Sequence, residues 1–349
     1  MAQDGCFIRN RDQVFFDLMN NMKILSHFIH YKKDRVGRFL LVKAWLGGLL
    51  FLSPLTSCSK EDEPEFKGKH FDYAALEDSI PDSVRYHVNP TFPVRTDSLR
   101  ILAIGNSFTE DAMQYMDAMV KASGIDMSRI CVSSLTEGSS TFKTWLNKDY
   151  ENTVFSLNRV TGTAVFNHEG KLGELLHQNW DVIVIQQSSS LSYNWKSFAY
   201  LKGLEEKILT YCTNPGLCLA FQLVWSHDHS EMPYVLEGNI ACCKKMMNRY
   251  GIDLIIPTGI AIQNARDTRL NDNMYLTRDY WHLNTGMARY IATATWFERL
   301  FKPVFNVMLI DNTCKPNGDY PDDDIALAKQ CVIKAVEEPM PDWIEIQEK

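Results

Sequence analysis

The chain has 349 residues, of which 45% are hydrophobic and 23% charged, and this composition is ordinary for a globular protein. Its formal net charge is −7 and it contains no basic stripe, so we expect no nucleic-acid partner, because phosphate contacts need clustered lysines and arginines. The nine cysteines form no C-x-x-C pair, which argues against a structural zinc site. Disulfides between Cys212 and Cys218 or between Cys314 and Cys331 are alternatives to buried free thiols.

Residues 1–58 are predicted to be an N-terminal extension that ends in a lipoprotein signal. A basic region over 32–43 precedes an apolar run over 44–54, which is shorter than the roughly 20 residues of a membrane span. Residues 55–58 read Leu-Thr-Ser-Cys and resemble a bacterial lipobox, in which the signal is cleaved before the cysteine and the thiol is lipidated. We therefore expect a lipid anchor on Cys58, at the outer membrane and facing the cell surface or the periplasm. An ordinary signal peptide or a buried apolar helix is the alternative.

Residues 59–99 are predicted to be an acidic tether and an irregular lead-in. The tether begins Ser-Lys-Glu-Asp-Glu-Pro-Glu over 59–65, a composition that favours a flexible segment. Its residues 60–62, Lys-Glu-Asp, resemble a short signal that sends some lipoproteins to the outer face of the outer membrane.

Residues 100–302 are predicted to form one α/β domain. Apolar runs alternate with amphipathic helical patterns, which implies a parallel sheet covered by helices on both faces. The five predicted strands cover residues 100–104, 130–135, 181–185, 217–221 and 252–256. The aromatic-rich segment 141–170 is harder to interpret, with a hairpin near 161–163 as one interpretation. Residues 303–349 are predicted to be a tail with one amphipathic helix over about 323–336.

The first strand runs directly into Gly105-Asn106-Ser107, and a helical pattern follows. A serine at this corner has its hydroxyl at the carboxyl end of a strand and at the N-terminus of a helix, where backbone N–H groups favour negative charge. Ser107 is therefore the candidate nucleophile. A serine that merely caps the helix is the alternative.

The candidate base is His282, which precedes the last amphipathic helix of the domain. Asp279 lies three residues earlier, so its carboxylate can reach the imidazole, fix its tautomer and stabilise the imidazolium. A surface histidine with no catalytic role is the alternative. The neighbouring His227, Asp228 and His229 have poor spacing for a metal site, and no metal is expected there.

Donors for a tetrahedral oxyanion are expected in the loops after the first three strands, because ligands in such sheets lie outside the carboxyl ends of the strands. The backbone N–H groups of Ser107 and Gly138 are two candidates, and the side-chain amide of Gln187 or Gln186 is a third.

Substrate contacts are expected from Asn106 and from tryptophans that can stack on a sugar ring. Trp281 is the best candidate because it lies between Asp279 and His282, and Trp225 and Trp145 are further candidates. A place in the core or at the rim is the alternative for each tryptophan.

These motifs resemble the signature blocks of the SGNH/GDSL-type hydrolases. Block one reads Gly105-Asn106-Ser107-Phe108, Gly138 stands for block two, and Asp279-x-x-His282 stands for block five. The match is closest to a poorly characterised branch of bacterial lipoproteins that begin Gly-Asn-Ser-Phe. Block three departs, because Gln-Gln-Ser-Ser at 186–189 replaces the usual Gly-x-Asn-Asp, whose asparagine is an oxyanion donor. Which glutamine takes over that role is open.

The resemblance implies a flavodoxin-like three-layer α/β sandwich with a five-stranded parallel sheet. It also implies a serine esterase with a Ser107-His282-Asp279 triad and no cofactor. O-acetyl esters on a glycan are the expected substrate, because related enzymes include carbohydrate acetylesterases. The alternatives are a non-catalytic glycan-binding lipoprotein with the same fold, and a lipase or thioesterase.

Overall fold

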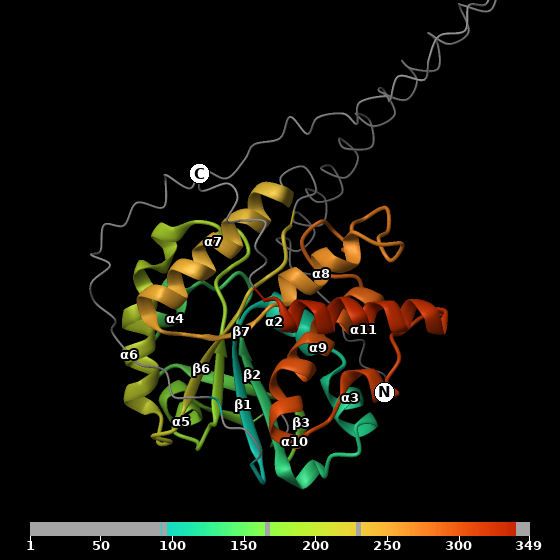
Figure 1. Ribbon diagram of the computed structural model, residues 1–349. Coiled ribbons are helices and arrows are strands. Elements are labelled where there is room, and N and C mark those ends of the chain that lie inside the picture. The colour runs from blue at the N-terminus through green and yellow to red at the C-terminus, as the bar shows by residue number, and fades with distance from the viewer. Residues whose placement is uncertain (1–91, 93–95, 165–167, 228–231, 340–349) are drawn as a thin grey trace, which may run out of the picture. The chain divides into compact units, whose positions relative to one another are not determined.

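The computed structural model describes residues 92, 96–164, 168–227 and 232–339 (Figure 1). Contacts divide the chain into the units 1–65 and 66–349, and all described residues belong to the second unit. The predicted lipoprotein signal with Cys58 and most of the predicted tether therefore lie outside the described residues.

The described residues form a seven-stranded sheet in the order β4-β3-β2-β1-β5-β6-β7. The five predicted strands are confirmed, and each pairs in parallel with its neighbour. They are β1 (Leu99–Gly105), β2 (Ile130–Thr136), β5 (Val182–Ile185), β6 (Cys218–Gln222) and β7 (Leu254–Ile256). Taken alone, these strands follow the flavodoxin-like order, with the topological switch point between β1 and β5.

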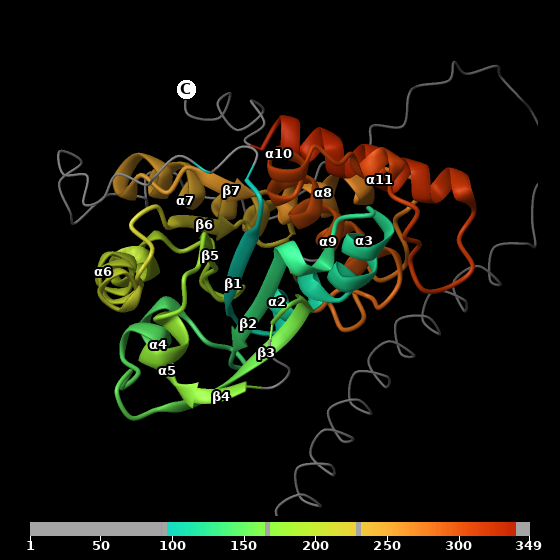
Figure 2. The same ribbon diagram turned by 90° about the horizontal axis from the view of Figure 1, so that it is seen from below.

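The prediction of a five-stranded, wholly parallel sheet is wrong in one respect. Two antiparallel strands, β3 (Val154–Gly162) and β4 (His168–Lys171), extend the sheet beyond β2 (Figure 2). Only two of the nine residues of β3 are buried, so β3 lacks the continuous apolar run that marks the other strands. Strands were predicted from continuous apolar runs, and residues 141–170 contain none. The sequence therefore indicated at most a hairpin near 161–163 in this segment.

Helices cover both faces of the sheet and make three layers (Figures 1 and 2). One group packs around α9 and contains α2 (Ser107–Met113), α3 (Met116–Ala122), α8 (Thr258–Arg266), α9 (Met287–Leu300) and α11 (Asp322–Glu337). The other layer contains α4 (Phe142–Leu146), α5 (Leu172–Leu176), α6 (Leu201–Tyr211) and α7 (Met232–Tyr250). Short connecting elements are η2 (Met127–Arg129), η3 (Trp195–Tyr200), α10 (Lys302–Phe305) and η4 (Leu309–Asp311).

The helical pattern after the first strand forms two helices, α2 and α3, with a break at residues 114–115. At the break the Tyr115 N–H donates to Thr293 Oγ1 of α9 at 3.2 Å. A tertiary hydrogen bond therefore takes the place of a bond within the helix, which apolar periodicity alone does not reveal.

Helix α11 packs against α8 and α9 and buries one apolar face, which contains Ile325, Ala328, Val332 and Ala335. The predicted helix of the C-terminal segment is therefore part of the same core. Seven cysteines lie in the described residues and all are free thiols, so neither considered disulfide forms. Among the described residues, no helix combines the length and the apolar character that a bilayer crossing requires.

Candidate active site

Ser107 is the first residue of α2 and follows β1 after one connecting residue, Asn106. Asn106 is extended and caps the helix, since its side chain accepts the N–H of Phe108 at 3.0 Å. A Cβ on Gly105 would lie 2.2 Å from Thr109 Oγ1 and 2.9 Å from Gln186 Cγ, so only glycine fits here. The sequence Gly-Asn-Ser thus makes a tight corner that presents the serine hydroxyl.

Three side chains form a hydrogen-bonded line at this corner. Ser107 Oγ lies 2.9 Å from His282 Nε2, and His282 Nδ1 lies 2.7 Å from Asp279 Oδ2. With the Nδ1 proton directed at Asp279, Nε2 is free to accept the hydroxyl proton of Ser107. The structure therefore brings together the three residues that the sequence predicts as nucleophile, base and orienting carboxylate.

Asp279 and His282 lie in a hairpin of residues 276–284, which precedes α9. Thr277 and Leu283 form an antiparallel bridge, and the Arg278 N–H donates to the His282 carbonyl at 2.8 Å. Asp279 Oδ1 accepts the N–H of Trp281 at 3.0 Å and of His282 at 2.7 Å, which holds the carboxylate at the tip.

Partial burial raises the pKa of Asp279, but the hydrogen bonds from the His282 backbone and side chain and from the Trp281 backbone outweigh it. The pKa of Asp279 therefore lies below its ordinary value of 3.8. The carboxylate is ionised at neutral pH, as an orienting partner of a histidine must be.

The line opens into a cavity of about 360 Å³. Ser107 lines it together with Trp281 and His282 of the hairpin. The loops after β2 and β5 supply five hydroxyl side chains: Ser139, Thr141, Ser188, Ser189 and Ser190. With Ser107, six of the ten residues that line the cavity therefore carry hydroxyl side chains.

The two glutamines after β5 hold the loops of the site in place from within. Both are buried, and Gln186 Nε2 donates to Asn106 Oδ1 at 2.6 Å while its Oε1 accepts from Thr109 and Gln222. Gln187 Nε2 donates to Ser197 Oγ at 2.9 Å, and its Oε1 accepts the N–H of Phe142 at 3.2 Å. The Gln186 amide is therefore bonded to the residue before Ser107 and the Gln187 amide to Ser197, so both have the hydrogen-bond partners that buried amides require. A glutamine as oxyanion donor stays a prediction.

Ser188 and Ser139 line the cavity and were not singled out from the sequence. When Gln-Gln-Ser-Ser at 186–189 is aligned with Gly-x-Asn-Asp, Ser188 takes the position of the asparagine. This alignment could have indicated Ser188 as a residue of the site. Ser139 follows the exposed Gly138, adopts a positive φ of 58° and lines the cavity. The loop is tied to the serine corner, since Ser140 Oγ donates to the Gly105 carbonyl at 2.8 Å.

The three tryptophans proposed for substrate stacking divide into one exposed and two buried residues. Trp281 is 39% exposed at the cavity, whereas Trp145 and Trp225 are 1% and 0% exposed. Trp225 stacks on Phe108 at 4.1 Å and donates from Nε1 to the Trp281 carbonyl at 2.8 Å. Trp145 and Trp225 therefore support the loops and do not reach a substrate.

The described residues contain no cluster of three or more metal-ligating side chains. His227 is buried and stacks on the Trp281 ring at 4.1 Å, so it supports the aromatic side of the cavity. Asp228 and His229 lie outside the described residues.

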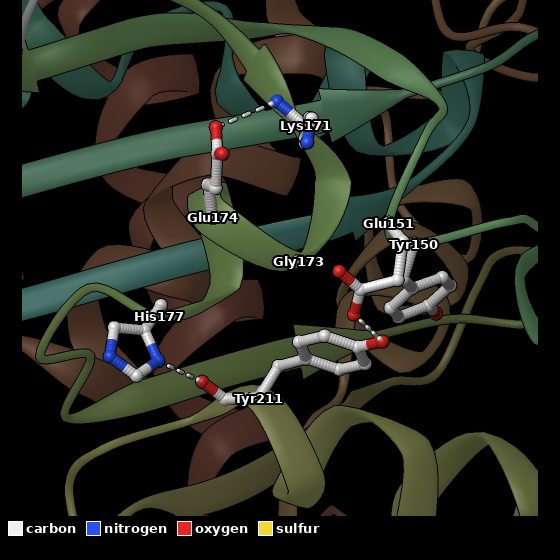
Figure 3. Close-up of a pocket in the computed structure, with 7 residues that line it drawn as sticks. All are labelled: Tyr150, Glu151, Lys171, Gly173, Glu174, His177 and Tyr211. Atoms are coloured by element: carbon white, nitrogen blue, oxygen red, sulfur yellow. Dashed lines mark hydrogen bonds between the residues drawn. The ribbon is translucent and has the colours of Figure 1, made fainter.

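A second hollow, of about 270 Å³, lies between Tyr150, Tyr211 and helix α5 (Figure 3). Its residues precede β5 and β6 in the chain, so it lies toward the amino ends of the parallel strands. Its hydroxyl groups and histidine are engaged locally: Tyr211 donates to Glu151 and His177 Nδ1 lies 3.1 Å from the Tyr211 carbonyl (Figure 3). It is therefore separate from the Ser107 cavity at the carboxyl ends.

Fold and site together define an α/β protein with a serine–histidine–aspartate line at the carboxyl edge of its sheet. Residues 100–332 match the family model "Domain of unknown function (DUF4886)", and the chain belongs to this family. No curated protein matches the chain at a significant level.

The solved structures that are similar to this chain include the following two. A DUF4886 family protein from Bacteroides uniformis ATCC 8492 is 27% identical with a TM-score of 0.60, over 70% of this chain and 97% of that one. A "putative SGNH hydrolase" from Slackia heliotrinireducens is 17% identical with a TM-score of 0.38, over 58% of this chain and 98% of that one. The similarity to the protein from Bacteroides uniformis supports the α/β fold.

Proposed function

We propose that this protein is a serine esterase of the SGNH type that hydrolyses O-acyl esters, with O-acetyl groups on a glycan as the substrate class. The observation that carries the proposal is the hydrogen-bonded line from Ser107 through His282 to Asp279, which opens into a cavity. A serine hydroxyl is a poor nucleophile until a base removes its proton, and this arrangement supplies the base.

In this proposal Ser107 Oγ attacks the ester carbonyl while His282 Nε2 takes its proton. The backbone N–H groups of Ser107 and Gly138 are the candidates to stabilise the oxyanion. His282 then protonates the departing alcohol, which leaves an acyl group on Ser107. Water, deprotonated by His282, attacks this acyl-enzyme, and collapse of the second tetrahedral intermediate releases the carboxylic acid and restores the serine.

The lining of the cavity supports a polar substrate. Residues with hydroxyl side chains from two loops line the cavity, and Trp281 offers an exposed aromatic ring beside His282. Sugars need both kinds of contact, hydrogen bonds for their hydroxyls and a flat apolar surface for a ring face.

The test is hydrolysis of a chromogenic acetate ester by the wild type and by Ser107→Ala. Loss of a triad member costs on the order of 10⁴ in rate or more, so the variant should lose nearly all activity. Ser123→Ala is a matched control, because Ser123 lies at the end of α3, outside the cavity. Equal rates for the wild type and Ser107→Ala would contradict the proposal, and faster hydrolysis of long-chain esters would contradict the acetyl preference.

A glycan-binding protein without catalytic activity is the second candidate. The specific observation in its favour is that Gln186 and Gln187, which stand at the third signature block, are engaged in the interior. Binding of acetylated glycans by a wild type that releases no acetate would support this candidate. Trp281→Ala should then weaken binding, because it removes the exposed ring.

We further propose that Cys58 carries a lipid that anchors the protein to the outer membrane. The support is the basic region, the apolar run and the Leu-Thr-Ser-Cys sequence that ends at Cys58. In a bacterial host, metabolic labelling with a fatty acid should mark the wild type, and Cys58→Ser should remain unlabelled. Equal labelling of both would contradict the proposal.

A further inference from the structure

We propose that Asp111 is a positioning residue that locks the 276–284 hairpin onto α2, so that His282 stays within hydrogen-bond distance of Ser107. This inference rests on the proposed esterase function. It concerns a buried carboxylate that none of the signature motifs contains.

Asp111 lies four residues after Ser107 on α2, one helical turn along the chain, and is 1% exposed. Its Oδ2 accepts the backbone N–H of Leu283 at 2.8 Å. Both of its oxygens also accept from Arg278 Nη1, at 3.2 and 3.3 Å. The carboxylate thus binds the residue before Asp279 and the residue after His282.

Arg278 also forms hydrogen bonds within the hairpin. Its Nη1 donates to the Leu283 carbonyl at 2.5 Å, while its backbone N–H donates to the His282 carbonyl at 2.8 Å. The Asp111 carboxylate therefore bonds both strands of the hairpin to α2, in addition to the hydrogen bond between Ser107 and His282. Ser107 and the pair Asp279–His282 are carried by the two elements that Asp111 connects.

A second cation, Arg289 of α9, lies 2.5 Å from Asp111 Oδ1. Burial raises the pKa of Asp111, and Arg289, Arg278 and the Leu283 N–H act in the opposite direction. A buried carboxylate is costly without such partners. The contact with Arg289 alone would serve to dock α2 on α9, whereas the contacts with Arg278 and Leu283 reach the hairpin and are not needed for that docking.

The inferred role is geometric. The Ser107 Oγ to His282 Nε2 distance is 2.9 Å, and a displacement of about 1 Å in a reacting geometry can lower the rate about 10²-fold. Without the carboxylate, the hairpin keeps its internal bridge, but the hydrogen bond between Ser107 and His282 is left to hold it to α2.

Asp111→Asn tests the inference, since asparagine keeps the volume but cannot accept from both arginines and from Leu283. With an acetate ester, kcat per active site should fall about 10²-fold while KM changes less than about threefold, because substrate contacts are retained. Active sites are counted by labelling with a serine-reactive inhibitor. Asp117→Asn is the matched control and should retain wild-type kcat, because Asp117 lies on the partly exposed side of α3 with Lys121 and Thr161.

A second measurement does not depend on turnover. The Nδ1 proton shared by His282 and Asp279 should give a strongly downfield proton resonance in the wild type and in Asp117→Asn. Asp111→Asn should broaden or lose this resonance. If the wild type hydrolyses no ester, the proposed function fails, and this resonance still decides whether Asp111 positions the hairpin.

A lower melting temperature of Asp111→Asn, with unchanged kcat per site and an unchanged resonance, would show a structural anchor only and overturn the inference. If Asp111→Asn does not fold, Arg278→Met removes one of the two hairpin contacts of Asp111 and leaves its bonds with Leu283 and Arg289. Arg278→Met should lower kcat about tenfold and weaken the resonance. Wild-type values of both in that variant would equally overturn the inference.

Discussion

The Asp279 carboxylate is held in position and kept ionised by hydrogen bonds from its immediate neighbours. It accepts two backbone N–H groups from its own turn and the imidazole proton of His282. These bonds favour the ionised form, so the pKa of Asp279 lies below 3.8. Its stabilising contribution is present above pH 3.8 and is lost only as the pH falls through the lowered folded value.

Asp279→Asn should therefore lower kcat strongly while the protein stays folded. The asparagine amide favours the wrong tautomer of His282, and the comparable change in a serine protease costs about 10⁴ in kcat. Ester hydrolysis and far-UV circular dichroism, measured on the same preparations, check this expectation. A variant within tenfold of the wild-type rate would show that Asp279 does not orient the base.

At the scale of one element, α6 contains a buried acidic residue whose ionisation should affect stability. Glu205 is 1% exposed, and neither carboxylate oxygen has a hydrogen-bond partner among the described residues. Burial raises its pKa from 4.5 to about 7. Because the unfolded chain releases this proton at lower pH than the folded chain, the free energy of unfolding falls as the pH rises between these values.

Glu205→Gln should abolish this dependence. The variant should be more stable than the wild type at pH 8, with a difference on the order of 3 kcal/mol that shrinks toward pH 5. Chemical denaturation at the two pH values measures it. Glu337→Gln is the control, because Glu337 is exposed and lies on another helix, α11, and it should follow the wild type at both values. Identical pH dependence of Glu205→Gln and wild type would contradict the expectation.

The elements differ in how clearly the sequence specifies them. β5 is buried along its whole length and has a continuous apolar sequence, whereas β3 buries only Leu157 and Thr161 and gives no such signal. The residues of the candidate site also differ in how far the sequence specifies their positions. Ser107, Asp279 and His282 were predictable because their order and spacing encode one constellation, but the glutamines were not, since only their partners Ser197, Gln222 and Asn106 decide where the amides point.

At the scale of the whole molecule, the flavodoxin-like order of the parallel strands sets the place of the site. The chain leaves β1 toward the layer that contains α2 and leaves the adjacent β5 toward the layer that contains α6, so the loops after these two strands diverge and leave a crevice between them. Ser107 follows β1, Ser139 follows β2 and Ser188 follows β5, which brings three serine-bearing loops to one crevice. The connectivity was inferable from the alternation of strands and helices, whereas the loop contacts required the structure.

The C-terminal helix completes the layer of helices around α9, so the fold should depend on it. Val332 is 0% exposed in α11, where it belongs to the face that packs on α8 and α9. Val332→Asp would bury an unpaired charge and should greatly lower soluble yield and melting temperature. Lys334→Asp places the same charge on the exposed face of α11 and should stay close to the wild type in both measurements.

The antiparallel extension of the sheet has a consequence for the protein in concentrated solution. β4 is an edge strand of four residues, His-Glu-Gly-Lys, and three of its side chains are exposed. At the opposite edge, β7 has only three residues. Short edges, one of them bearing charges, are poor templates for a strand of another molecule, so the sheet resists growth into intermolecular β-structure. Glu169→Val combined with Lys171→Val should remove that protection, which would be seen as concentration-dependent light scattering.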